Sequence, residues 1–372
     1  MAAEPFPLIE LSGSPEARGR RYGAEAAERI RLGLGHYQAQ LERLGLDAGA
    51  VRQAARHQLR AIAGFDDAHA AEIRAIAEGA GVETEDIALL NARTEILRQA
   101  RRGPEEAPDG CTGAVLLPAV TRDGRLLHGQ NWDWKVECAE TSVVLRVRQE
   151  NGPDYLTFTE AGGLARSGIN DAGIGLTANN LECERDGQTD GVPLPLIRRR
   201  VLESADLALA LHAVRATPKS ASNNMMLSHA RGFAASLECA PDESFALLPE
   251  NGILVHANHW LSPAALARLR DTGLDATPDS LYRQERVRSH LATRAPLGLA
   301  ELRDAFVDDF GSPWSVCRPP RRGLSGNLTA TVAMILLDPG QGELWAAPLP
   351  AVNRRFTRYR LAGGPAEAAT FG

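Results

Sequence analysis

The sequence lacks several features that would place it in a common class of protein. None of its apolar runs approaches the roughly 18 residues that a membrane-spanning helix requires. The first residues, MAAEPFPLIELSG, contain no basic segment followed by a continuous apolar stretch, so they do not resemble a signal peptide. A net charge of -6 and a pI near 5.9 argue against nucleic acid as a partner. We therefore expect a protein that acts neither on nucleic acid nor in a membrane.

Cysteine is scarce and irregularly spaced. The five cysteines contain no CxxC pair, and an odd number in a long chain does not suit a disulfide framework. We therefore predict no metal site and no cofactor. The simplest location is the cytoplasm, because a reducing compartment would keep a thiol nucleophile usable.

The composition, 44% apolar and 24% charged, is that of an ordinary globular protein. In residues 15–45 and 51–63, apolar positions recur three and four apart, which predicts helices. Two more helices are predicted, one that ends at Gly79 and Gly81 and one that begins with Thr84 as its N-cap.

A charged segment rich in proline and glycine, RRGPEEAPDG at residues 101–110, follows these helices and is interpreted as a linker. After it, apolar residues alternate with a period of two. Residues 112–120 and 124–132, which flank a TRDG turn, predict a β-hairpin. Further blocks of strands separated by helices predict a layered α+β protein with largely antiparallel sheets. The linker divides the chain into a helical part, 1–110, and a strand-rich part, 111–372.

Two local clusters of basic residues interrupt the acidic balance. The first is Arg198 to Arg200, and the second is Arg318 with Arg321 and Arg322. Each is typical of a solvated helix face or loop rather than of a phosphate site.

Cys111 lies where the linker meets the first predicted strand. If the Gly110–Cys111 bond were broken, Cys111 would gain an α-amino group beside its own thiol. With an ordinary pKa of about 7.7–8.0, this amine can take the thiol proton directly or through a water, and no histidine base is needed. Gly110 permits strained dihedrals and a close approach of the thiol because it has no Cβ. On composition alone, a buried core residue is the competing interpretation of Cys111.

Short motifs around Cys111 follow one another in a specific order. They are Asp109-Gly110-Cys111-Thr112, Gly129-Gln130-Asn131-Trp132-Asp133, Glu160-Ala161-Gly162, Gly168-Ile169-Asn170 with Gly173, His256-Ala257-Asn258-His259 and Ser315-Val316-Cys317-Arg318. Together with the helical segment EIRAIAEGAGVETEDIALLNARTEI, they span about residues 72 to 338. This ordered set resembles the acyl-CoA:6-aminopenicillanic acid acyltransferase (isopenicillin N acyltransferase) family of N-terminal-nucleophile (Ntn) hydrolases.

The resemblance implies an αββα sandwich and autocatalytic cleavage before Cys111. The small N-terminal subunit, 1–110, and the catalytic subunit, 111–372, would then form an αβ heterodimer. The resemblance also implies a thioester on Cys111, a place for Asp133 near the nucleophile and its amine, and Asn258 as an oxyanion-hole donor. A turn carboxylate and a backbone-bonding turn amide are the competing interpretations of the last two residues.

Other residues of the motifs have open roles. Either Asn179 or Asn180 matches a second oxyanion donor of related cysteine Ntn hydrolases, although a role in a turn is equally compatible with the sequence. Arg318 would orient Asp133, bind a substrate carboxylate or form a structural ion pair. Trp132 is a candidate for an acyl pocket or for the core, as are Trp134, Trp260 and Trp314. His256 and His259 have the i, i+3 spacing of a metal pair, but no third ligand is near, so we expect packing or hydrogen-bonding histidines.

The substrate is expected to be a small-molecule amide or acyl donor, acyl-CoA included. Water as the acceptor would make the protein an amidohydrolase, and an amine would make it an N-acyltransferase. Because the sequence indicates no strongly cationic surface for coenzyme A, hydrolysis is slightly favoured. Asn327 and Leu328 stand where fungal penicillin-forming relatives carry a Ser-Arg pair. The loss of that arginine argues against isopenicillin N as the substrate. The competing functions are a Cys–His protease, for which no papain-like or caspase-like signature is present, and a non-catalytic binding protein with an unprocessed chain. A serine hydrolase is not supported because no GxSxG motif is present.

Overall fold

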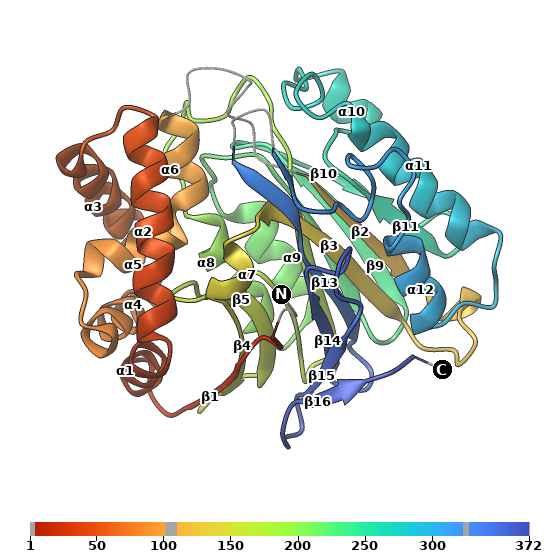
Figure 1. Ribbon diagram of the computed structural model, residues 1–372, viewed down its shortest axis with the longest axis horizontal. Coiled ribbons are helices and arrows are strands. Elements are labelled where there is room, and N and C mark those ends of the chain that lie inside the picture. The colour runs from red at the N-terminus through yellow and green to blue at the C-terminus, as the bar shows by residue number, and fades with distance from the viewer. Residues whose placement is uncertain (1–3, 101–109, 323–326, 372) are drawn as a thin grey trace.

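Two β-sheets lie face to face at the centre of the molecule, and helices cover their outer faces (Figure 1). The computed structural model describes residues 4–100, 110–322 and 327–371. Residues 101–109, most of the predicted linker, lie outside the described residues.

The first sheet has the strand order β1-β4-β5-β6-β7-β8-β9-β10. Its strands are β1 (Leu8–Ser12), β4 (Ser142–Arg148), β5 (Tyr155–Glu160), β6 (Ser167–Asn170), β7 (Ile174–Asn180), β8 (Asn223–His229), β9 (Phe233–Cys239) and β10 (Ser244–Leu247). Neighbouring strands are antiparallel except for β1, which runs parallel to β4. The helical part of the chain thus contributes the edge strand β1, which the sequence analysis did not predict.

The second sheet has the order β11-β2-β3-β13-β14-β15-β16, and β12 pairs with β13. Its strands are β2 (Cys111–Leu116), β3 (Leu127–Lys135), β11 (Ile253–His256), β12 (Arg321–Arg322), β13 (Leu328–Asp338), β14 (Glu343–Pro348), β15 (Phe356–Arg360) and β16 (Glu367–Ala369). Buried side chains of the two sheets meet between them, with Leu156 and Phe158 from β5 in one cluster with Val332 and Ile335 from β13.

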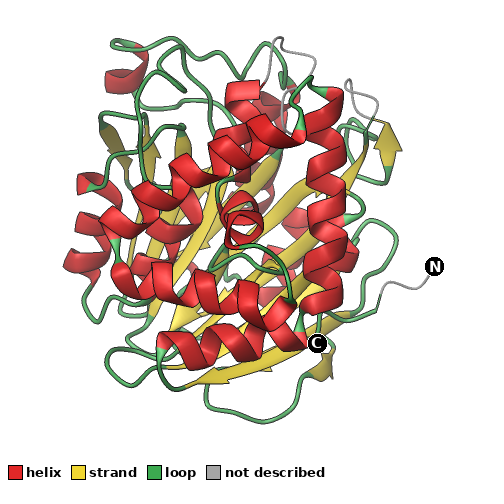
Figure 2. Ribbon diagram, turned by 90° about the vertical axis from the view of Figure 1, so that its left-hand side faces the viewer, coloured by secondary structure: helices red, strands yellow, loops and turns green. Residues whose placement is uncertain are grey.

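Helices form the two outer layers. Against the first sheet lie α1 (Pro15–Glu25), α2 (Ala27–Arg43), α3 (Ala48–Phe65), α4 (Asp67–Ala80), α5 (Thr84–Asn91), α6 (Arg93–Ala100), α8 (Leu194–Leu202) and α9 (Leu207–Ala216). Against the second lie α11 (Asp279–Ala292) and α12 (Leu299–Phe306). Short turns of helix occur at α7 (Cys138–Thr141), η2 (Pro118–Val120) and α10 (Pro263–Leu266). The view in Figure 2 shows the first helical layer in front of the strands. The predicted αββα sandwich with largely antiparallel sheets is confirmed.

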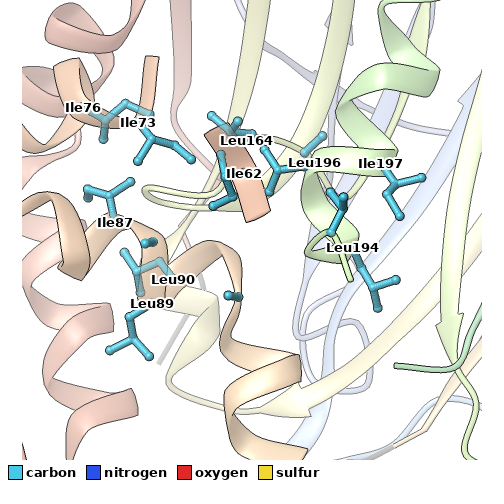
Figure 3. Close-up of a cluster of buried hydrophobic side chains, with 14 of the residues drawn as sticks. Ile62, Ile73, Ile76, Ile87, Leu89, Leu90, Leu164, Leu194, Leu196 and Ile197 are labelled. Carbon is cyan, nitrogen blue, oxygen red and sulfur yellow. The ribbon is translucent and has the colours of Figure 1, made fainter. Parts of the chain in front are cut away.

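The N-terminal helices share one hydrophobic core with the strand-rich part of the chain. Figure 3 shows Ile62 of α3, Ile73 of α4 and Ile87 of α5 in the same buried cluster as Leu196 and Ile197 of α8. Burial of each such side chain contributes about 1.5–3 kcal/mol. Residues 4–100 are therefore packed against the sheet rather than attached to it by a linker alone.

Two details of the helical part differ from the sequence analysis. The predicted helix 15–45 is divided at Ala26, which caps α1 and precedes α2. Helix α4 continues through Gly79 to Ala80, and Gly81 caps it with a φ of 65°. Gly79 has another role, because a Cβ there would lie 2.2 Å from the carbonyl oxygen of Arg20 in α1. Thr84 is the first residue of α5, and Glu83 is its N-cap.

The prediction of solvated basic clusters is wrong for four arginines. Arg198 and Arg199 of α8 are buried, and so are Arg318 and Arg321. Arg199 pairs with Glu72 of α4 and with Glu203. Glu203 lies at the i, i+4 spacing from Arg199, but the sequence carries no sign of Glu72, which is more than a hundred residues away.

Candidate active site

Cys111 is the first residue of β2 and lies between β3 and β11 in the second sheet. It faces Trp132 across the β2–β3 pair. Its side chain is 3% exposed and its thiol is free. Burial raises the pKa of this thiol, Arg166 opposes the shift, and Asp133 adds to it. A base must therefore remove the proton before the sulfur can act as a nucleophile.

The peptide bond before Cys111 is held at each of its polar groups. The carbonyl oxygen of Gly110 accepts a hydrogen bond from the Asp133 N–H at 3.0 Å. The Cys111 N–H donates to Asn258 Oδ1 at 2.6 Å. Arg283 Nη1 donates to the Cys111 carbonyl oxygen at 2.8 Å. This clamp fixes the bond that the sequence analysis identifies as the cleavage site.

Gly110 lies against two guanidinium groups. A Cβ built on Gly110 would be 2.6 Å from Arg283 Nη2 and 2.9 Å from Arg318 Nη2. The sequence analysis explained this glycine by backbone freedom and by the approach of the thiol. In the structure, a Cβ at this position would require the guanidinium of Arg283 or Arg318, or the backbone of Gly110, to shift.

A buried chain of charges supports the clamp. Asp133 Oδ1 accepts a hydrogen bond from Thr331 Oγ1 at 2.7 Å, and its Oδ2 lies 3.3 Å from Arg318 Nε. Arg318 also pairs with Asp279, which accepts from Arg283 Nε at 2.6 Å. Burial alone would raise the pKa of Asp279, but Arg283 and Arg318 lower it, so the carboxylate stays ionised.

Of the three roles open to Arg318, its contacts favour the orientation of Asp133 over the binding of a substrate carboxylate. It lies against Asp133 and does not line the cavity beside Cys111. The sequence analysis missed Asp279 and Arg283. Their i, i+4 spacing in α11 is a weak signal for an ion pair, but nothing in the sequence places that helix beside Cys111.

A cavity with about 660 Å³ of unfilled space, part of it open to solvent, adjoins Cys111. One wall comes from α2 and α6 of the N-terminal part, and the other comes from the strands and α8. Its lining includes Leu44, Leu97, Cys111, Trp132, Asp133, Trp134, Ala178, Asn180 and Leu194, with the arginines 93, 98, 166 and 198. Its mixed apolar and polar lining beside the Cys111 thiol suits a small organic substrate.

The candidate oxyanion donors lie in different surroundings. Asn179 is fully buried, donates to the His256 carbonyl oxygen at 2.9 Å and does not line the cavity. Asn180 lines the cavity, and its side-chain oxygen accepts from Arg98. Asn258 Nδ2 donates to the Asn180 carbonyl oxygen at 2.9 Å. The Asn258 amide thus joins the Cys111 N–H to β7.

The remaining candidates divide into cavity and core. Trp132 and Trp134 line the cavity, whereas Trp260 belongs to a separate hydrophobic cluster. His256 pairs with Glu238 at 2.9 Å, and His259 bonds Ser280 at 2.8 Å, as expected for hydrogen-bonding histidines. Within residues 4–100, 110–322 and 327–371, no group of three metal-binding side chains comes together.

The site thus places a buried cysteine at the start of a strand, on a sandwich of two largely antiparallel sheets. A family model described as acyl-coenzyme A:6-aminopenicillanic acid acyl-transferase matches residues 120–347. The acyl-coenzyme A:6-aminopenicillanic-acid-acyltransferase 40 kDa form of Emericella nidulans is 32% identical over 266 residues, which cover 69% of each chain. The protein therefore belongs to the acyl-coenzyme A:6-aminopenicillanic acid acyltransferase family, as the motifs predicted.

Solved structures give two further similarities. Conjugated bile acid hydrolase from Clostridium perfringens (mutant C2A) matches with a TM-score of 0.47 at 14% identity, covering 70% of this chain and 97% of the other. Penicillin V acylase from Agrobacterium tumefaciens matches with a TM-score of 0.47 at 13% identity, covering 68% and 86%.

Proposed function

We propose that the protein is a self-processing Ntn amidohydrolase that cleaves its own chain between Gly110 and Cys111 and then uses Cys111 on a small-molecule amide. The observation that carries this proposal is the clamped peptide bond at the edge of the cavity, with the Cys111 thiol beside it. Family membership supports the same class of chemistry.

Processing begins with attack of the Cys111 sulfur on the carbonyl carbon of Gly110. The carbonyl oxygen then carries negative charge, and the Asp133 N–H donates to it. The C–N bond breaks as the nitrogen of Cys111 takes a proton in place of the one lost by the thiol, which leaves a thioester. Water hydrolyses the thioester and releases the Gly110 carboxylate, the thiol and a free α-amine.

Turnover uses the amine that processing creates. Asn258 Oδ1 accepts from the amide nitrogen of Cys111 in the uncleaved chain and can hold the amine at the same place. The amine takes the thiol proton, and the sulfur attacks the amide carbonyl of the substrate. The substrate amine leaves with a proton, and water releases the acid from the thioester. We propose that Asn258 Nδ2 then donates to the oxyanion, with a second donor from the cavity wall at Asn180. Asp133, held by Arg318, orients the α-amine.

Transfer of the acyl group to an amine is the second candidate function. It is favoured by the name of the Emericella nidulans relative, an acyltransferase of acyl-coenzyme A and 6-aminopenicillanic acid. The two functions share the thioester and differ in the molecule that accepts the acyl group.

We also propose a cytoplasmic location, since the five cysteines are all free in the structure. Among the described helices, none has both the length and the apolar character needed to cross a membrane.

Acylation of Cys111 tests the proposal. Purified protein is mixed with phenylacetyl and octanoyl p-nitroanilides, and p-nitroaniline release and the mass of the Cys111 fragment are followed. We expect release and a transient acyl adduct with wild type, none with Cys111→Ala, and wild-type behaviour with Cys239→Ala, a buried cysteine outside the cavity. A second arm supplies phenylacetyl-CoA with or without 6-aminopenicillanic acid, and an amide product there would favour transferase over hydrolase. A thiol that no donor acylates would contradict both functions.

A further inference from the structure

Arg198 is a buried cation that forms no ion pair with any carboxylate in the described part of the chain. It lies in α8, lines the cavity, and is 6% exposed. Among the described residues its guanidinium makes one hydrogen bond, from Nη2 to Asn223 Oδ1 at 3.3 Å, and its Nε has no partner. Arg199, the next residue, shows what a structural arginine in this helix does, because it pairs with both Glu72 and Glu203.

Arg166 shares these properties and lies nearer the nucleophile. It is 8% exposed, and its guanidinium lies over the Trp132 ring, 4.3 Å from the centroid. Arg166 Nη2 is 3.8 Å from Cys111 Sγ, and Nε has no partner in the described part of the chain. Neither Arg166 nor Arg198 has a described carboxylate within ion-pair distance.

The charges around the cavity leave an excess of positive charge at these two residues. Of the four arginines on the wall, Arg93 pairs with Glu160 and Arg98 pairs with Asp186. Glu95 raises the pKa of Arg198, but the two side chains form no ion pair: one Glu95 oxygen accepts from the Leu194 N–H, and the other has no partner among the described residues.

Burial lowers the pKa of Arg166 and of Arg198, and the neighbouring cations Arg93 and Arg166 lower that of Arg198 further. A buried charge is costly unless it is paired. An anion in the cavity would lower this cost, which is the arrangement expected of a site for a charged ligand.

We infer that Arg166 and Arg198 form an anion subsite that binds a carboxylate of the amide substrate, within a few bonds of the scissile amide. The inference rests on the proposed function of Cys111. The short distance between Arg166 and the sulfur limits where the anion can be, because a group that contacts Arg166 must lie close to the reacting carbonyl. The phosphates of an acyl-CoA lie at the far end of its pantetheine arm and do not meet this condition. Guanidinium groups also match carboxylates in geometry.

The test compares matched substrates that differ only in one charge. On the amine side the pairs are N-phenylacetylglycine with N-phenylacetylglycinamide, and N-octanoylglycine with N-octanoylglycinamide. On the acyl side the pair is N-benzylsuccinamate with the corresponding primary amide, with benzylamine release as the readout. We expect processed wild-type enzyme to have a kcat/KM at least about tenfold higher for the carboxylate in one of the two arms, as a charge-assisted hydrogen bond implies. The arm that shows this preference identifies the side of the scissile bond that carries the anion.

Variants then assign the preference to residues. Arg198→Gln keeps a donor for Asn223 and removes the charge, so the carboxylate-to-carboxamide ratio should fall about tenfold or more, whereas Arg198→Lys should retain part of it. Arg215→Gln, which removes an exposed arginine of α9, should leave the ratio and both rates unchanged.

Equal rates for carboxylate and carboxamide in both arms of the wild-type test would overturn the subsite while leaving the proposed function intact. This wild-type result decides the question even if Arg198→Gln does not fold. A ratio that Arg198→Gln and Arg198→Lys leave unchanged would also overturn the assignment. If no substrate of either charge acylates Cys111, the proposed function fails, and the subsite fails with it.

Discussion

The carbonyl and amide groups around the Gly110–Cys111 bond have separate partners, and each partner comes from a different element of the fold. Asp133 is on β3, Asn258 follows β11, and Arg283 is on α11. A small change at any of these points alters the position of the bond relative to the thiol. The residues nearest the bond should therefore affect processing more strongly than folding.

Gly110→Ala should slow self-cleavage by about tenfold or more, because a misplaced reacting group is costly even at small displacements. The new Cβ would lie 2.6 Å from Arg283 Nη2 and must push the guanidinium or the carbonyl away. The fraction of cleaved chain is measured against time after synthesis in a cell-free system. Gly35→Ala is the control, since a Cβ at this α2 position meets no atom within 4 Å. Cleavage of Gly110→Ala at the wild-type rate would show that the contact does not constrain the bond.

Asn258→Ala should slow processing and, in chains that have been cleaved, lower kcat by about a hundredfold, the usual effect of removing one oxyanion donor. Its side chain is the acceptor for the Cys111 N–H, so the loss affects the uncleaved chain as well. Asn151→Ala, an exposed loop position, is the matched control. If the variant processes and turns over as wild type does, Asn258 has a structural role only.

At the scale of secondary-structure elements, one histidine joins the two sheets. His128 of β3 bonds Ser228 of β8 at 2.9 Å and Thr177 of β7 at 2.9 Å. It is fully buried, and burial lowers its pKa from 6.5 to about 3. The neutral ring is thus part of the contact between the sheets.

The stability of the protein should fall with acid partly through His128. Because its pKa is lower in the folded state than in the unfolded state, the unfolded chain binds one more proton between pH 6.5 and about 3. The stabilisation is complete above pH 6.5 and is lost as the pH falls, at about 1.4 kcal/mol per pH unit in the lower part of this range. The free energy of unfolding is measured with urea at pH 5.5, 5.0 and 4.5. Between these pH values it should fall less steeply with acid for His128→Gln than for wild type. Parallel slopes for the two proteins would contradict a neutral buried histidine.

Several elements follow from local pattern, since the hairpin strands β2 and β3 and the helices α1 to α5 lie where alternation or helical spacing predicts them. The edge strand β1 was missed, because five residues that pair with β4 more than a hundred positions away leave no local signal. Likewise, Cys111, Asp133 and Asn258 came from motifs, whereas Arg166, Arg198 and Arg283 did not. The roles of these three arginines depend on whether each is buried and whether a carboxylate pairs with it. A run such as IRRRV reveals neither property.

For the whole molecule, the part of the chain before Cys111 is built into the same fold as the part after it. Strand β1 pairs with β4, helices α3 to α5 share a core with α8, and Arg93 and Arg98 of α6 bind Glu160 and Asp186. Helix α6 also forms one wall of the cavity.

The two pieces should therefore remain together after cleavage. Processed protein should elute from a sizing column at the position of the uncleaved Cys111→Ala chain, with both fragments in one peak, and should separate only in denaturant. Separate peaks for the two fragments in native buffer would contradict the shared core, and the cavity would then lack one of its walls.

The most direct test of the central claim is the intact mass of the purified wild-type chain beside that of Cys111→Ala. The account predicts that the 40.0 kDa wild-type chain is converted into pieces of about 12 and about 28 kDa, in proportion to 110 and 262 residues, with the larger piece beginning at Cys111. The variant should remain whole. A wild-type chain that keeps its full mass, with a Cys111 thiol that no acyl donor modifies, would contradict the account and favour a binding protein.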